Sequence, residues 1–65
     1  MTVRIPRLVY EGIEAVRQSG RTNMLDRTTV QRLCMKLSYY NAVVWLELNK
    51  REYAKGIFEG FEVEE

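Results

Sequence analysis

The sequence predicts an all-α fold, a compact single domain of three to four short helices with short connectors that spans residues 1–65. Three observations lead to this prediction. Apolar residues recur at three- and four-residue steps along most of the chain. Residues that favour helix caps separate these patterns. A length of 65 residues allows one domain at most, and a chain this short buries a modest fraction of its surface.

The first helix is predicted over residues 6–19. Pro6 suits the first helical position, where its missing N–H is no loss. Gly20 suits the residue after the helix, because glycine adopts the left-handed conformation readily. Gly12 lies on the apolar face and would let another backbone come close. That face consists of Ile5, Leu8, Val9, Gly12, Ile13 and Val16.

The second helix is predicted from Arg27 to Ser38. Asp26 is a favourable N-cap residue, and Leu25 and Val30 occupy the positions of a hydrophobic staple around it. The residues from Ser38 to Asn41 are interpreted as a tight connector, with Asn41 as the cap of the next helix.

A third apolar pattern follows, and Asn49 interrupts it. Asn49 and Glu52 are spaced like a capping box, and Leu48 and Tyr53 stand at staple positions. This favours a break at Asn49 and a fourth helix, while periodicity alone also allows one continuous helix over residues 41–59. In the tail, Phe61 and Val63 alternate with glutamates, which fits either a short strand or packing on the last helix.

The predicted core collects the apolar residues on these helix faces. Its members are Ile5, Leu8, Val9, Ile13, Val16, Val30, Leu33, Leu37, Val44, Trp45, Leu48, Ile57 and Phe58.

Charge is uneven along the chain although the formal net charge is only +1. Residues 1–36 hold seven basic and three acidic side chains, whereas residues 37–65 hold three basic and six acidic ones. This asymmetry fits an anion-binding half, head-to-tail self-association, or solvated helix faces that happen to differ.

The composition excludes several kinds of site. One cysteine, Cys34, rules out an intrachain disulfide and cannot make a zinc site alone, and a chain without histidine has no imidazole base and no histidine-bound metal. Cys34 falls on an apolar stripe, which favours a buried thiol over a reactive one. No phosphate-binding glycine motif is present. We therefore expect a protein that is not an enzyme and needs no cofactor or metal.

The location follows from similar reasoning. No apolar run is long enough to span a membrane, and the N-terminus lacks the apolar region of a signal peptide. A single unpaired cysteine suits a reducing compartment. We expect a cytoplasmic protein.

Two groups of residues are candidates for binding. Arg21, Thr22, Asn23 and Arg27 flank the start of the second helix, where free N–H groups could cradle a phosphate. The competing interpretation is a connector, since Asp26 already places a negative charge there. Tyr39 and Tyr40 form the second group, as interface contacts or as turn residues packed on the core.

A helix-turn-helix is the main alternative architecture. Cys34, Ser38 and Val44 stand at compatible offsets for that motif. The would-be recognition helix is mostly apolar, however, and offers only Asn41, Asn49 and Lys50 for DNA contacts.

The segments YEGIEAVRQSGRTNMLD and VVWLELNKREYAKGIFEGFEV resemble a family of short proteins encoded by phages and prophages of Gram-positive bacteria, a domain-of-unknown-function family. The resemblance covers nearly the whole chain. It implies a phage accessory protein acting in the cytoplasm of a bacterial host cell, and it transfers no activity. We expect a small homo-oligomer that binds a host or phage protein, with a nucleic-acid-binding regulator as the alternative.

Overall fold

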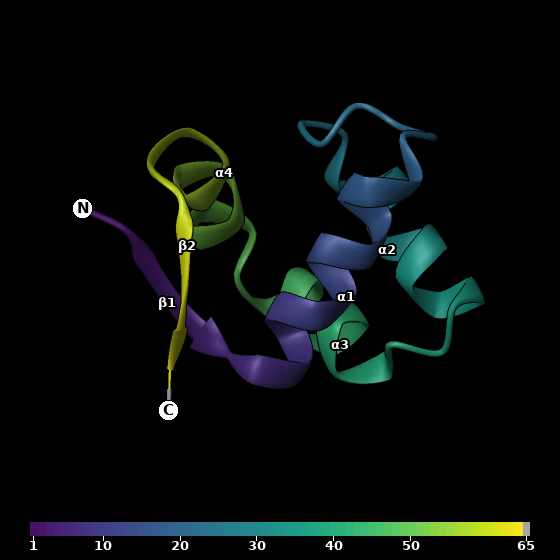
Figure 1. Ribbon diagram of the computed structural model, residues 1–65, viewed down its shortest axis with the longest axis horizontal. Helices are drawn as coiled ribbons and strands as arrows, with labels where there is room; N and C mark the ends of the chain where they lie inside the picture. The colour runs from purple at the N-terminus through teal and green to yellow at the C-terminus, as the bar shows by residue number, and fades with distance from the viewer. Residues whose placement is uncertain (65) are drawn as a thin grey trace.

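The computed structural model describes residues 1–64, and Glu65, the last residue of the predicted domain, lies outside the described residues. The chain is all-α in character, as predicted, with two short strands added at its ends (Figure 1). The elements in chain order are β1 (Val3–Pro6), α1 (Arg7–Ser19), α2 (Arg27–Lys36), α3 (Tyr40–Leu48), α4 (Lys50–Glu59) and β2 (Phe61–Glu64).

Helix α1 matches its prediction to within a residue at each end. Pro6 is its N-cap, so the helix itself begins at Arg7. Gly20 ends it in the left-handed conformation, with φ of 66°, and donates its N–H to the carbonyl of Arg17. The buried residues of α1 are Val9, Gly12, Ile13 and Val16.

The turn between α2 and α3 begins earlier than predicted. Helix α2 ends at Lys36, because Ser38 has a positive φ of 69° that no α-helix accommodates. The N–H of Tyr39 donates to the carbonyl of Cys34 at 2.8 Å, which closes the turn. Helix α3 begins at Tyr40, one residue before the expected cap at Asn41.

The predicted break at Asn49 is confirmed, and the continuous helix is excluded, because α3 and α4 are separate helices. The predicted capping box was wrong. The Asn49 amide donates back to the carbonyl of Trp45 at 3.0 Å, so its side chain closes α3 instead of capping α4. Leu48 is 76% exposed, which shows that its expected packing in the core does not form.

The two strands bring the ends of the chain together. β1 and β2 pair in parallel, with Val3 opposite Phe61 and Ile5 opposite Val63. In Figure 1 they lie side by side at the end of the molecule that also carries α4. The centre of the Phe61 ring lies 6.3 Å from that of Trp45, in an edge-to-face arrangement, and 5.9 Å from that of Tyr53. These ring contacts anchor β2 to the helices.

The observed core overlaps the predicted one only in part. Its buried members are Ile5, Val9, Ile13, Val16, Val30, Cys34, Ala42, Leu46 and Tyr53. Leu33, Trp45 and Ile57 are partly buried against it. Five predicted core residues are instead at least half exposed, namely Leu8, Leu37, Val44, Leu48 and Phe58.

The close contact between α1 and α3 explains much of this difference. A Cβ atom placed on Gly12 would lie 2.7 Å from the Cβ of Ala42, so the two helices touch at that point. Ala42 and Leu46 are one helical turn apart, so they lie on the same side of α3, and both are buried. Val44 and Leu48 then point to the opposite side of α3, because residues two positions apart lie on different sides of a helix.

None of the helices within residues 1–64 combines the length and apolar character that a membrane crossing requires.

Candidate functional site

The segment between α1 and α2 is held by hydrogen bonds of its own. The Asn23 side-chain oxygen accepts the N–H of Leu25 at 2.9 Å, and the Asn23 carbonyl accepts the N–H of Asp26 at 2.9 Å. Leu25 is 56% exposed, so it does not form the predicted staple, and Met24 packs on the core in its place. Asn23, a predicted binding residue, thus has a structural role.

Asp26 caps α2 as predicted. Its carboxylate accepts the Thr29 hydroxyl at 2.7 Å and the Thr29 N–H at 3.2 Å. These two hydrogen bonds hold the pKa of Asp26 below its ordinary value, and the bond from the Thr29 hydroxyl has the larger effect. A carboxylate thus occupies the first turn of α2, which argues against the predicted phosphate cradle.

Tyr53 ties this segment to α4. Its hydroxyl donates to the carbonyl of Met24 at 2.5 Å, and its side chain is only 2% exposed. The connection joins positions 29 residues apart in the chain. The backbone around Met24 is therefore fixed from two sides.

Arg27 takes part in a polar chain that links α2 to α3. Its guanidinium donates to the Gln31 side-chain oxygen at 2.6 Å. The Gln31 amide donates in turn to the carbonyl of Val43 and to the carboxylate of Glu47, both at 3.1 Å. The hydrogen bond from Gln31 lowers the pKa of Glu47, and the positive charge of Lys50 lowers it further. Arg27 therefore supports the contact between α2 and α3 through Gln31.

The remaining loop candidates differ from each other. The Thr22 hydroxyl donates only weakly to the Asn23 carbonyl, at 3.4 Å. Arg21 donates its N–H to the Ser19 hydroxyl oxygen at 3.3 Å, which sets the direction in which its side chain leaves the end of α1. Arg21 is the only one of the four loop candidates whose side chain lines a cavity among those described in residues 1–64.

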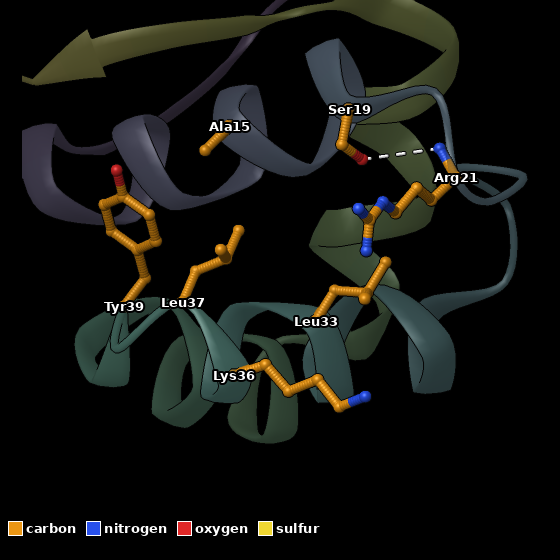
Figure 2. A pocket seen from close by; sticks show the side chains of 7 residues that line it. All are labelled: Ala15, Ser19, Arg21, Leu33, Lys36, Leu37 and Tyr39. Carbon is orange, nitrogen blue, oxygen red and sulfur yellow. Dashed lines mark hydrogen bonds between the residues drawn. The ribbon is translucent and has the colours of Figure 1, made fainter.

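That cavity is a half-open cleft of about 440 Å³ between α1 and α2, which we call the cationic cleft. Apolar side chains form its centre, with the Arg21 guanidinium at one end and Tyr39 at the other (Figure 2). Its lining residues are Ala15, Ser19, Arg21, Leu33, Lys36, Leu37 and Tyr39. The structure therefore brings together Arg21 and Tyr39 from the two predicted groups of candidates.

The charges around the cationic cleft are unbalanced. Within residues 1–64, the side chains of Arg21 and Lys36 have no hydrogen-bond or ion-pair partner, whereas Arg17 pairs with Glu14 at 2.7 Å. No carboxylate is among the residues that line the cleft. The cleft combines an apolar centre with uncompensated positive charge.

Tyr40 belongs to a different surface, on the outward side of α3. Together with three other side chains, each 54–76% exposed, it forms what we call the apolar ridge: Leu8, Tyr40, Val44 and Leu48. The three residues of α3 follow one another at four-residue steps on one face. Leu8 joins Tyr40 in lining a shallow hollow at the start of α3.

Tyr39 packs inward as well as lining the cleft. It is partly buried, and a Cβ atom on Gly12 would lie 3.0 Å from the Cβ of Tyr39. The interpretation of Tyr39 as a turn residue packed on the core is therefore correct, whereas Tyr40 is 57% exposed.

Sequence reasoning did not assign the other residues of these two surfaces to a site. Leu8, Leu37, Val44 and Leu48 were expected in the core because they are apolar at helical spacing. A usable signal was present in α3, which has apolar residues around most of its circumference although a helix on the surface normally has a polar outer face.

The helix-turn-helix offsets agree with the structure only partly. Cys34 is buried between the helices and Ser38 takes the left-handed conformation in the turn. Val44 is 57% exposed, so it does not lock α2 and α3 together. The outward face of α3 is the apolar ridge, which offers few partners to base edges or phosphates.

Cys34 is buried, as predicted. Burial raises the pKa of its thiol to about 11, so the thiol is protonated near neutral pH.

Comparison with known proteins adds one positive finding. A search of curated proteins and a search of solved structures each returned no match. Residues 6–61 match the family described as Domain of unknown function (DUF5049). Since this match covers α1 to α4 and the start of β2, the chain belongs to that domain family of unknown function.

Proposed function

We propose that this protein acts by binding other proteins, without catalysing a reaction, and that it works as a small homo-oligomer. The observation that carries the proposal is the apolar ridge. Seven of the nine residues of α3 are apolar, which is typical of a buried helix, and yet α3 is covered on one side only. Its outer face therefore fits an interface better than a surface that remains in water.

A second copy of the chain is the occupant that we assign to the apolar ridge. Side chains at four-residue steps form a ridge that packs against an identical ridge across a two-fold axis. Antiparallel pairing of two α3 helices would place Val44 near the axis and Tyr40 of one copy near Leu48 of the other. Glu47, the one charged residue of α3, is 3.5 Å from Lys50 of its own chain, so the pairing brings no uncompensated acid to the interface.

The size of such an interface sets a further requirement. A standard interface removes about 800 Å² from each partner, roughly a fifth of the 4470 Å² that this chain exposes. A helix of nine residues is only about 14 Å long, so α3 alone does not supply that area. Leu8 at the start of α1 extends the apolar ridge beyond α3, and Asn41 and Glu47 supply a polar rim.

For the biological setting we propose a phage or prophage accessory protein in the cytoplasm of a bacterial host, with a host or phage protein as its partner. Support comes from the sequence resemblance to phage and prophage proteins and from the single buried cysteine. Membership of the domain family names no activity, and so adds nothing to the choice of partner.

The experiment compares Val44→Asp with a matched control, Leu25→Asp, by sedimentation equilibrium. The two native side chains are 57% and 56% exposed, so each substitution places its charge on the surface of the monomer, and circular dichroism checks that both variants are folded. In a two-fold interface each substitution occurs twice, and we expect Val44→Asp to weaken self-association about a hundredfold or more. Leu25→Asp should leave it unchanged. Equal effects of both substitutions would refute the assignment of the apolar ridge.

The second candidate function is a nucleic-acid-binding regulator. The packing of α2 on α3 across a left-handed turn favours it, and the apolar outer face of α3 counts against it. Binding to random duplex DNA, measured at increasing salt, separates the two functions. A nucleic-acid binder loses affinity steeply with salt, because phosphate contacts release counterions.

A further inference from the structure

We propose that the cationic cleft is a second binding site, and that it takes an acidic amphipathic helix of a partner protein. The proposal deepens the proposed binding function by naming the chemistry of the partner, and it rests on that function only in the assumption that the protein binds other proteins. It does not depend on self-association, because the cationic cleft and the apolar ridge share no residue.

The apolar centre of the cleft matches the side chains of a helix. Leu33 lies on α2, Leu37 is the C-cap residue one turn later, and Ala15 faces them from α1 (Figure 2). Leu37 is 50% exposed although sequence periodicity places it on the inward face of α2. A helix laid between α1 and α2 would cover it with apolar residues spaced three and four positions apart.

The charges of the cleft select an acidic partner. Arg21 and Lys36 lie on its rim without partners among residues 1–64, and no carboxylate lines it. A bound helix carrying glutamates beside its apolar face would pair with both cations. The guanidinium of Arg21 is suited to a carboxylate, since its planar donors form two parallel hydrogen bonds.

Other ligand classes fit this arrangement less well. Nucleic-acid phosphates would meet the cations and leave the apolar centre unused, because phosphate contacts are polar. A small amphipathic carboxylate would leave much of its surface in water, since the cleft is half open and small-molecule sites usually enclose most of their ligand.

The segment that ends α1 positions Arg21. Gly20 adopts the left-handed conformation that turns the chain, and the Ser19 hydroxyl oxygen holds the N–H of Arg21. The Ser19 hydroxyl in turn donates to the carbonyl of Val16 at 2.6 Å. The backbone of Arg21 is therefore held by the same residues that end the helix.

The test uses a synthetic helical peptide with leucines at three- and four-residue spacing and glutamates beside them, labelled for fluorescence anisotropy. A charge-reversed peptide, with lysine in place of glutamate, is the ligand control. Binding of the acidic peptide should weaken about tenfold or more in the Arg21→Ala/Lys36→Ala double variant. It should also weaken with added salt.

Arg32→Ala is the matched protein control, because Arg32 is an exposed cation of α2 that does not line the cleft. It should change the affinity less than about threefold, which is within the range of screened surface charges. Leu37→Ser should weaken binding through the apolar centre, and circular dichroism checks that each variant is folded.

Three results would overturn the proposal. The first is no binding of the acidic peptide at concentrations up to about 1 mM, the level of a very weak complex. The second is equal binding of the acidic and the charge-reversed peptides. The third is an equal loss in Arg32→Ala and in the double variant, which would show attraction by net charge alone. None of these readouts measures self-association. A result against the cationic cleft is therefore distinguishable from a result against the apolar ridge as a dimer interface.

Discussion

Tyr53→Phe tests how the segment between α1 and α2 is held. The substitution keeps the ring and removes the hydroxyl that donates to the carbonyl of Met24. A typical intramolecular hydrogen bond contributes about 1 kcal/mol net, and an acceptor left without water costs more. We expect the free energy of unfolding at neutral pH to fall by about 1–2 kcal/mol. For a domain of this size, each 1 kcal/mol lowers the melting temperature by roughly 4–8 °C.

The same residue predicts how stability depends on alkaline pH. Burial, followed by the nearby Cys34 and Asp26, raises the pKa of Tyr53 from 10.0 to about 12. The folded state therefore favours the neutral phenol. The contribution of Tyr53 to the free energy of unfolding is fully present below pH 10 and is lost as the pH rises to about 12. A shift of two units corresponds to about 2–3 kcal/mol at most.

The assay is urea unfolding followed by circular dichroism at pH 8 and at steps up to pH 11.5, a range chosen from the pKa of about 12. Cys34 contributes in the same direction between pH 9 and about 11. The comparison is therefore made in a Cys34→Ala background. Tyr53→Phe should be less stable at pH 8 and less sensitive to alkali. Equal stability at pH 8, together with an unchanged pH slope, would refute the role of the hydroxyl.

Two further predictions concern helix contacts and caps. Gly12→Ala should lower the free energy of unfolding by about 1–2 kcal/mol, because the clash with Ala42 outweighs the gain in helix propensity. Glu11→Ala, on the exposed face of α1, is the control in the same urea titration. Equal stability of the two variants would contradict the close contact between Gly12 and Ala42. Asp26→Ala should lower the melting temperature more than Asp26→Asn, which keeps an acceptor for Thr29. The lowered pKa of Asp26 means that its contribution is present above its unfolded pKa and is lost in acid, so the gap between wild type and Asp26→Ala should narrow as the pH falls.

How far the fold could be predicted differs from helix to helix. Helix α1 has a clear polar and a clear apolar side, so its bounds and its buried face were predictable, apart from the exposed Leu8. Helix α3 has apolar residues around most of its circumference, and its pattern does not say which side is buried. The contact of Gly12 with Ala42 makes that choice, and it joins residues 30 positions apart. The parallel pairing of β1 with β2 joins the two ends of the chain, which local patterns do not encode.

The candidate residues show the same limit. Arg21 and Tyr39 were identified as an exposed loop cation and an aromatic residue near a turn, and both line the cationic cleft. Lys36 was not singled out, and Leu37 was expected in the core. Asn23 and Arg27 were candidates for binding because they flank the start of the predicted second helix. Their hydrogen bonds within the chain show that these polar side chains support the fold.

The central claim, that the apolar ridge is an interface between copies of this chain, is tested most directly by the mass in solution. Multi-angle light scattering should give the wild type a mass of twice 7.7 kDa, and Val44→Asp a mass of 7.7 kDa at the same concentration. A wild-type mass of 7.7 kDa at every concentration measured would contradict the claim.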